Sequence, residues 1–478
     1  MKNIVKVPLI VIGVFVAVIV SMAALKLCPP QGPWPMPPWC ESGIKLPKLV
    51  IPFIPGVNVE VSELKLENTI VIPTDLEKIS YPTSYQQPIQ NSATVKNPYC
   101  TVDAEVVAYP ASYLGAYALP EIKEAPLPID IRRAVGIKDS WMHEPNLNNC
   151  PIARDPMFDS FEKTLKRVKA LNAQEIHITN FVSFKSFQDA TLDMNSKVIS
   201  DRTLQRMTDT ASKNGLGVVL YLNVAPGDQK VSEIPNNEWL AKFIDNYEPF
   251  LLNQAQIAQS TGMSGLMLGH FDYQPSVKGH ENVYNEKMLG LLKKVRAIYS
   301  GKIIFLIEPT MGADLNKMDK LLNEVDAYIY TPTTRPLFSS QDKTVSVSNL
   351  KGQYLRDFEY IGATYGKYKK SIYVRILVQS EKDFLVNGWN EDQFCIKRGD
   401  NPCYQKDLVV EFSAQAIAYE GIMEALKYAH NRYFQVGAVD TYGYWYTDVM
   451  LPKNSQPQMA HTIRNKPAES IVKAWFAE

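Results

Sequence analysis

The chain has 478 residues, enough for one large domain with additions or for two to three ordinary domains. Apolar residues make up 46% and charged residues 21%, a composition that indicates a folded globular protein and excludes a disordered chain. Lys plus Arg and Asp plus Glu both number 50, so the sequence has no excess of positive charge for a polyanion. Nucleic-acid binding is therefore excluded as the main function.

The first segment, residues 1–27, is predicted to be a transmembrane anchor. Residues 4–25 are mostly apolar and carry a single charge, Lys6, and about 20 such residues in a helix span the hydrocarbon core of a bilayer. Lys2 and Lys6 favour a cytoplasmic N-terminus, which would leave the remaining chain outside the cytoplasm. A cleaved signal peptide, with small residues in "SMAA", is the alternative. A lipoprotein is disfavoured because Leu27 precedes Cys28.

All six cysteines follow this segment, which fits an exported protein with disulfide bonds. No pair has the C-x-x-C spacing of a metal site. Proximity in the sequence favours the pairs 28–40, 100–150 and 395–403. Other pairings, and six free buried thiols, remain open.

Residues 28–130 are rich in proline and have no strong helical period. Segments such as "LPKLVIPFIPGVNVEV" and "NTIVIPTDL" predict short extended pieces that proline interrupts. We expect a stalk, or a collar that packs along the main domain.

From residue 131 to 478, strand-like apolar segments alternate with amphipathic helical patterns. Strands are predicted within 132–138, 175–181, 216–224, 264–269, 302–308, 326–331, 371–378 and 434–439. Because most of these segments are apolar throughout, both faces of the sheet should be buried, as in a parallel sheet covered by helices. The pattern predicts an α/β protein with a (β/α)8 TIM barrel. An open doubly wound sheet is disfavoured because no G-x-G-x-x-G follows a strand.

In such a barrel, functional side chains follow the carboxyl ends of the strands. The sequence places carboxylates, amides and aromatic residues there. The predicted catalytic residues are Asp272, Glu308 and Asp440, and the predicted substrate-binding residues are Asn180, Asn223, His270, Tyr273, Arg335, Glu381, Tyr442, Tyr444 and Trp445. Glycoside hydrolysis uses two carboxyl groups, and aromatic faces with planar polar groups bind sugars. No metal or cofactor is expected, because the histidines lack ligand spacing.

Two of these predictions have alternatives or consequences that the structure can test. Asp440 has a structural alternative, in which it pairs with Arg335 or Arg375. Arg375 lies within an apolar strand and is expected to point into the barrel and hold a carboxylate. Glu308 follows five apolar residues, so we expect burial to raise its pKa, while Asp272 stays ionised in a wetter environment.

The region 131–478 resembles exported (β/α)8 glycoside hydrolases of the clan-A type. The resemblance rests on the order of the elements, on "YEPFLLNQAQIAQSTGMSGLMLG", which leads into the fourth strand, and on the aromatic residues after the eighth. The resemblance implies an acid Glu after strand four and a nucleophile Glu after strand seven. Here Asp272 follows strand four, and Gln379 and Ser380 precede Glu381 after strand seven.

Three functions stay open at this point. The first is a membrane-anchored, extracytoplasmic glycoside hydrolase acting on an oligo- or polysaccharide. The second is a non-catalytic barrel that binds carbohydrate or assembles with other surface proteins. The third is a different (β/α)8 hydrolase or lyase. Expected partners are carbohydrate and, through the N-terminal helix, the membrane.

Overall fold

The computed structural model describes residues 109, 111–138, 154–184, 186, 189–193, 198–226, 234–271, 277–307, 314–332, 345–381, 384–387, 409–445 and 461–478. The chain divides into two units, Met1–Ile79 and Ser80–Glu478, and all of these residues belong to the second. The predicted membrane span, the six cysteines and most of the predicted collar lie outside them. Among the helices that are described, none combines the length and apolar character needed to span a bilayer.

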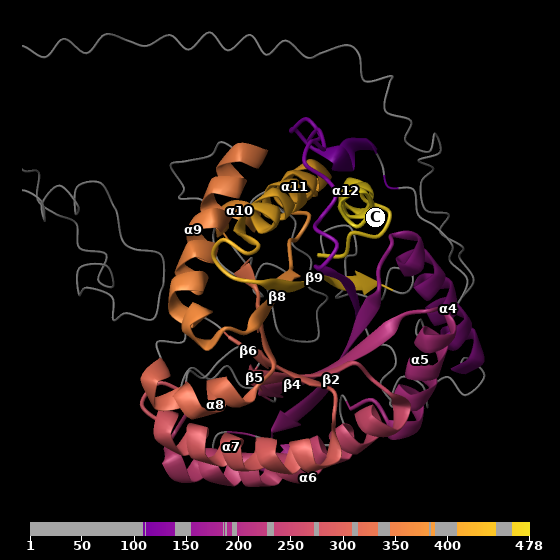
Figure 1. Ribbon diagram of the computed structural model, residues 1–478. Helices are drawn as coiled ribbons and strands as arrows, with labels where there is room; N and C mark the ends of the chain where they lie inside the picture. Colours follow the sequence, from indigo (N-terminus) through magenta and orange to yellow (C-terminus); the bar gives the residue numbers. More distant parts are fainter. Residues whose placement is uncertain are drawn as a thin grey trace, which may run out of the picture. The chain divides into compact units, whose positions relative to one another are not determined.

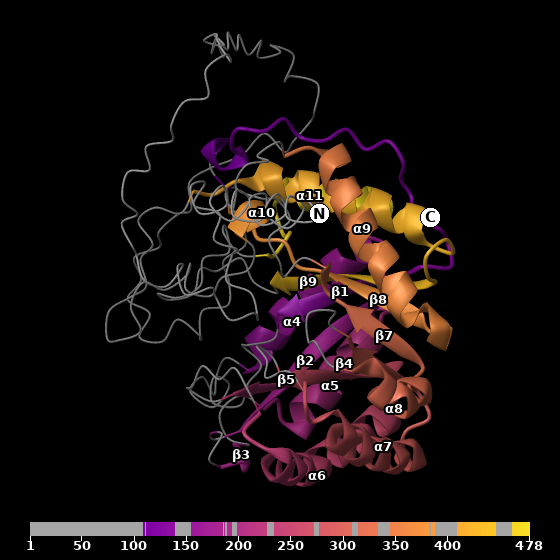
Figure 2. The same ribbon diagram turned by 90° about the vertical axis from the view of Figure 1, so that its left-hand side faces the viewer.

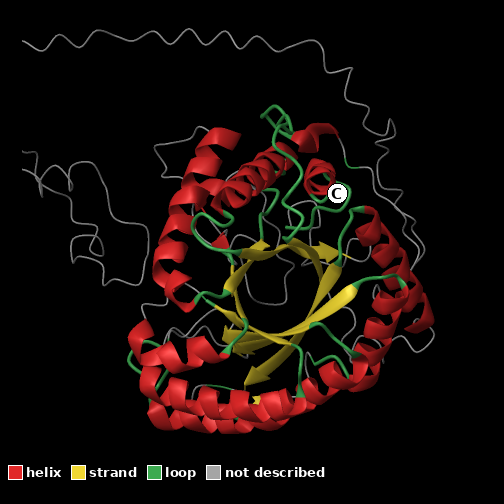
Figure 3. Cartoon of the chain, viewed as in Figure 1, coloured by secondary structure: helices red, strands yellow, loops and turns green. Residues whose placement is uncertain are grey.

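Eight parallel strands close into a barrel, which confirms the predicted (β/α)8 fold (Figure 3). They are β1 (Arg132–Lys138), β2 (Glu175–Phe184), β4 (Gly217–Pro226), β5 (Gly265–Phe271), β6 (Lys302–Leu306), β7 (Ala327–Tyr330), β8 (Ser371–Ile376) and β9 (Val436–Trp445). The order is β1-β9-β8-β7-β6-β5-β4-β2, and pairing of β1 with β2 closes the ring. The short β3 (Leu192–Asp193) joins β2 in antiparallel pairing.

Helices surround the barrel (Figures 1 and 2). The main ones are α4 (Arg154–Ala170), α5 (Asp201–Lys213), α6 (Asn237–Thr261), α7 (Glu281–Ile298), α8 (Asp319–Glu324), α9 (Val347–Tyr365), α11 (Phe412–Ala429) and α12 (Pro467–Trp475). Shorter helices are η3 (Ala111–Leu114), η5 (Leu315–Met318), η7 (Gly366–Tyr368) and α10 (Phe384–Asn387).

Local signals set where several helices begin and end. The Ser200 and Asn236 side chains cap α5 and α6 by accepting from the backbone N–H groups of Thr203 and Trp239. Helix α6 ends at Gly262, which has a left-handed backbone conformation with φ of 70°. The strand-to-helix order that the hydrophobic pattern predicted is therefore supported by polar side chains at the turns.

The sheet separates two buried regions because successive side chains of a strand point to opposite faces. Outside the sheet, a continuous apolar shell lies between strands and helices and includes Ile178, Leu220 and Val374. Inside the barrel, a smaller apolar cluster contains Val219, Tyr221, Met267, Ile304, Leu306, Ala327, Ile329, Tyr373 and Ala438. The inner face of the strands also carries charged side chains.

The segment before β1 packs against helices that surround the barrel. Ala116 donates its backbone N–H to Glu411 Oε1 at 2.8 Å, and Leu127 N–H donates to the Trp475 carbonyl at 2.9 Å. Glu124 Oε1 lies 2.9 Å from Lys351 Nζ on α9. Where the predicted collar is described, it is thus an extended segment against the barrel, with η3 as its helical turn.

Candidate functional site

A line of alternating charges runs through the barrel interior. Arg132 Nη2 lies 2.8 Å from Glu175 Oε2, and Glu175 Oε1 lies 3.3 Å from His177 Nε2. On the other side of the imidazole, His177 Nδ1 lies 2.9 Å from Asp440 Oδ2. The same oxygen accepts a hydrogen bond from Arg375 Nε at 2.7 Å. We call these five residues the charge ladder.

The strands bring the charge ladder together by their alternation and register. Glu175 and His177 are two residues apart on β2, so they share its inner face. Arg375 on β8 is directly paired with Asp440 on β9. On the opposite neighbour, β1, a Cβ atom at Gly136 would lie 3.1 Å from Asp440 Oδ1 and 2.8 Å from the Tyr442 ring. Glycine at position 136 therefore leaves the space that these two side chains occupy.

The charge ladder holds Asp440 in its ionised form. Burial opposes ionisation, but the attraction of His177 and Arg375 outweighs it and lowers the pKa of Asp440 to about 2. Burial likewise opposes the charge of His177, but Asp440 and Glu175 outweigh it and raise its pKa to about 9. With both groups charged, the ladder holds three cations and two anions, an excess of one positive charge.

These contacts argue against the predicted catalytic role of Asp440 as a proton donor. A carboxylate with a pKa of about 2 cannot donate a proton at neutral pH. Its side chain is also fully buried. The structure instead confirms the alternative stated from the sequence, in which Asp440 pairs with Arg375, and it confirms that Arg375 points into the barrel and holds a carboxylate.

Two aromatic rings lie against the Arg375 guanidinium. Its Cζ atom lies 4.4 Å from the centre of the Tyr221 ring and 4.6 Å from that of Tyr442. Tyr442 stacks in turn on His461, with ring centres 5.5 Å apart. The next residue, Gly443, has a left-handed backbone conformation with φ of 83°, and a Cβ atom at this position would lie 1.9 Å from the His461 ring. The Tyr221–Arg375–Tyr442–His461 stack thus fixes the guanidinium within the barrel.

Of the two asparagines predicted to bind substrate, one faces the barrel interior and the other faces the surrounding helices. Asn223 is on the same face of β4 as Val219 and Tyr221, which line the interior. Asn180 points to the other face of β2, where it donates to Gln254 Oε1 at 3.0 Å and accepts from Ile199 N–H at 2.8 Å. These contacts are structural, which corrects the prediction for Asn180.

The predicted aromatic group divides in the same way. Tyr442 faces the barrel interior. Tyr444 is buried on the outer face of the sheet, beneath the helices, where its hydroxyl donates to Glu469 Oε1 of α12 at 2.5 Å. The prediction that Tyr444 binds substrate is thus corrected. A register shift in the β1–β9 pairing, which skips Gly443, accompanies the change of face. Trp445 is the last residue of β9, and its side chain is not described.

Glu381 follows β8, is 3% exposed, and forms an antiparallel bridge with Val410. His270 belongs to β5, but its side chain is not described. The remaining predicted site residues, Asp272, Tyr273, Glu308 and Arg335, lie outside the described residues. Within the described part of the chain, no group of His, Cys, Asp and Glu side chains has the arrangement of a metal site.

Sequence reasoning did not identify three members of this interior: Glu175, His177 and Tyr221. A usable signal was present in "EIHIT", in which charged or polar residues alternate with isoleucine. That alternation means one apolar and one polar face, and in a barrel covered by helices only the interior can take the polar face.

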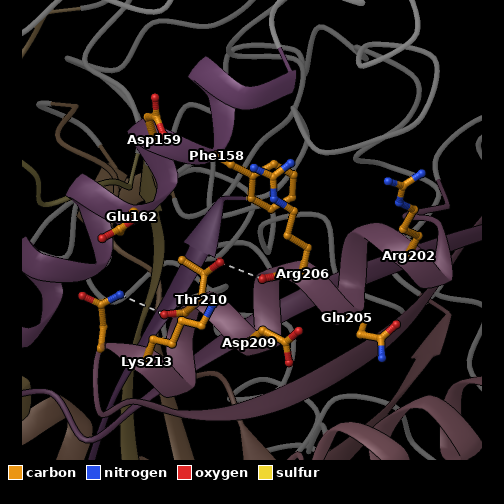
Figure 4. Close-up of a pocket in the computed structure, with 10 residues that line it drawn as sticks. Phe158, Asp159, Glu162, Arg202, Gln205, Arg206, Asp209, Thr210 and Lys213 are labelled. Atoms are coloured by element: carbon orange, nitrogen blue, oxygen red, sulfur yellow. Dashed lines mark hydrogen bonds between the residues drawn. The ribbon is translucent and has the colours of Figure 1, made fainter.

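A separate hollow of about 410 Å³ lies on the outer surface along α4 and α5 (Figure 4). Three acidic and three basic side chains line it: Asp159, Glu162, Asp209, Arg202, Arg206 and Lys213. The Arg206 guanidinium lies 3.8 Å from the Phe158 ring centre. None of the residues predicted to act on substrate lines this hollow, so the barrel interior remains the candidate site.

No protein-family model and no curated protein matches the chain. Among solved structures, the GH113 beta-mannanase from Alicyclobacillus acidocaldarius, in complex with ManMIm, is 14% identical with a TM-score of 0.52. That match covers 73% of this chain and 97% of the mannanase. A second GH113 beta-1,4-mannanase is 15% identical, with a TM-score of 0.49, and the match covers 73% and 99% of the two chains. In its fold, this chain is similar to (β/α)8 glycoside hydrolases.

Proposed function

We propose that this protein is a membrane-anchored, extracytoplasmic glycoside hydrolase that acts on an oligo- or polysaccharide through Asp272 and Glu308. The observation that supports this most directly is the pairing of β5 with β6. These strands are parallel neighbours, with Leu268 opposite Phe305. Asp272 directly follows the last residue of β5, and Glu308 comes two residues after the end of β6. Parallel neighbours end at the same rim, so both carboxylates should leave the barrel at its mouth.

The two carboxylates take different roles in this proposal. Glu308 follows the buried Leu306 and Ile307 and is proposed as the proton donor to the leaving glycosidic oxygen. Asp272 stays ionised and acts as the nucleophile or as the base that activates water. Asp440 does not react; it holds Arg375 in the interior.

The location is proposed from the sequence alone. The apolar segment 4–25 with Lys2 and Lys6 before and within it would anchor the chain and place the barrel outside the cytoplasm. Such a location would also favour disulfide bonds among the six cysteines.

A second candidate is a non-catalytic carbohydrate-binding or assembly subunit. The segment after β8 favours it, because Glu381, the first acidic residue after that strand, is only 3% exposed. The second candidate predicts glycan binding without turnover.

The test uses the full-length protein in detergent, assayed against a panel of neutral and acidic glycans. Asp272→Asn and Glu308→Gln should each lower kcat by about 10²–10⁴-fold, the usual contribution of a positioned acid or base. Asp209→Asn and Glu162→Gln are matched controls, since both carboxylates lie in the outer hollow. Unchanged turnover in both mouth variants contradicts the assignment, and binding without turnover by the wild type supports the second candidate.

A further inference from the structure

The guanidinium of Arg375 is buried but has few acceptors. Its side chain is 6% exposed. Among the described residues, Nε donates to Asp440, and Nη2 has only the Met267 sulfur, at 3.5 Å. Arginine has five N–H donors, and a thioether is a weak acceptor. Several N–H groups at the end of the Arg375 side chain therefore have no strong acceptor among the described residues.

Other polar atoms on the inner face of the strands are also buried without a hydrogen-bond partner in the described part of the chain. They include Thr179 Oγ1, Asn223 Oδ1 and the second carboxylate oxygen of Asp440, Oδ1. Thr179 is paired in register with Tyr221, the residue that stacks on Arg375, and Asn223 lies two residues farther along β4 toward its carboxyl end. We call Thr179, Asn223 and Arg375 the lumen cluster. Buried polar groups in native proteins are nearly always hydrogen-bonded, so this cluster calls for a ligand or ordered water.

The chemistry of the cluster restricts the ligand. An arginine fork fits a planar carboxylate, and the excess positive charge of the ladder favours one anion. The Asn223 Oδ1 atom, in contrast, requires a donor. Inorganic anions and simple carboxylates supply acceptors alone, whereas a sugar acid supplies a carboxylate and hydroxyl donors on one ring.

We propose that the lumen cluster binds an acidic sugar, with Arg375 donating to its carboxylate and with Asn223 and Thr179 pairing with its hydroxyl groups. The proposal rests on the proposed function in that the ligand is a carbohydrate, and it assigns uronic-acid-containing glycans as the substrate class. Tyr442, which stacks on Arg375, would form part of the wall beside the bound ring.

A purely structural role for Arg375 is the alternative, in which its one task is to neutralise Asp440. The two roles differ in what Arg375→Lys does. Lysine keeps the charge beside Asp440 but loses the fork, so a structural role predicts folded protein with unchanged ligand preference. The proposed role predicts loss of the preference for acidic over neutral sugars.

The experiment measures binding of D-glucuronate and D-galacturonate to the full-length protein by calorimetry, with D-glucose and D-galactose as neutral matches. Wild type should bind the acidic sugars at least about tenfold more tightly, and Arg375→Lys should remove that difference, as one lost bidentate contact is typically a tenfold effect or more. Arg464→Lys is the matched control. Arg464 is 8% exposed and donates to Thr164 Oγ1 at 2.8 Å, away from the lumen cluster.

If Arg375→Lys does not fold, the double variant Arg375→Gln/Asp440→Asn removes both charges of the pair together. It should fold and bind acidic and neutral sugars equally. Equal binding of both kinds by the wild type overturns the inference, as does equally tight binding of acetate or sulfate, which would make this a site for an adventitious ion only.

The same measurements separate this inference from the proposed function. A wild type that prefers glucuronate but cleaves no glycan supports the inference and contradicts the hydrolase. A wild type that cleaves neutral glycans through Asp272 and Glu308, with no preference for acidic ones, overturns the inference and supports the hydrolase.

Discussion

Two carboxylates, each with 0% exposure, lie on opposite sides of the barrel wall and behave in opposite ways. In the interior, Asp440 is contacted by His177 and Arg375, and its pKa is lowered to about 2. In the outer shell, Glu420 of α11 accepts a hydrogen bond from Trp475 Nε1 at 2.7 Å. Burial raises the pKa of Glu420, and Glu424 adds to the effect. Burial alone therefore does not set the charge; the partners on each side do.

The largest expected effect comes from breaking the charged side of this comparison. Asp440→Asn leaves Arg375 and His177 in the interior without their shared counter-ion. We expect a loss of about 3–5 kcal/mol in the free energy of unfolding, the usual result of removing one partner of a buried ion pair. Urea titration at pH 7 measures it. A loss below about 1 kcal/mol would show that the ladder is not an electrostatic unit.

The pH dependence of stability gives the next effect. The folded pKa of His177 is raised to about 9 from an ordinary value of 6.5, so the stability that it contributes is fully present below pH 6.5 and lost as the pH rises through 9. Over that range we expect wild type to lose about 2–3 kcal/mol more than His177→Gln. Parallel pH profiles of the two proteins would contradict the ladder. His430→Gln, a histidine paired with the half-exposed Asp130, is the control.

Gly136→Ala tests how tightly the interior is packed around Asp440. The added Cβ would lie 2.8 Å from the Tyr442 ring and 3.1 Å from Asp440 Oδ1. We expect a loss of about 1–3 kcal/mol, as for other small-to-large changes in a packed core. The matched control is Gly290→Ala in α7, where a Cβ meets no atom within 4 Å and alanine should stabilise the helix slightly. Thermal unfolding of both variants provides the measurement.

Glu420→Gln should have the smallest effect, although its carboxyl is as buried as that of Asp440. Glutamine keeps an oxygen that can accept from Trp475, and it removes a group whose ionised form burial disfavours. We expect a change within about 1 kcal/mol at pH 7. The raised pKa adds stability at acid pH that is lost as the pH rises, so this variant should also flatten that part of the profile. An effect as large as that of Asp440→Asn would remove the contrast between the two regions.

Much of the fold could be predicted from the sequence, because local patterns of apolar and polar residues specify the strands and helices of the barrel. All eight predicted strands overlap observed strands, since apolar segments between amphipathic helices bury both faces of a sheet. The helix ends at Ser200, Asn236 and Gly262 are likewise local, because a cap needs only the residues of one turn. Arg375 was predicted to hold a carboxylate because an arginine in an apolar strand requires a counter-ion.

Apart from the Arg375–Asp440 pair, the tertiary structure decided which polar residues meet inside the barrel. Asn180 and Asn223 both stand toward the carboxyl ends of their strands, yet one faces the helices and the other the interior. The shift at Gly443 likewise turns Tyr444 away from the face of Tyr442. The alternation of side chains between the two faces of a strand can be read from the local sequence. Which of the two faces lies inside the barrel is set only when the strands close into a ring. Strands β2, β8 and β9 come from distant parts of the chain, and only their closure joins His177, Arg375 and Asp440.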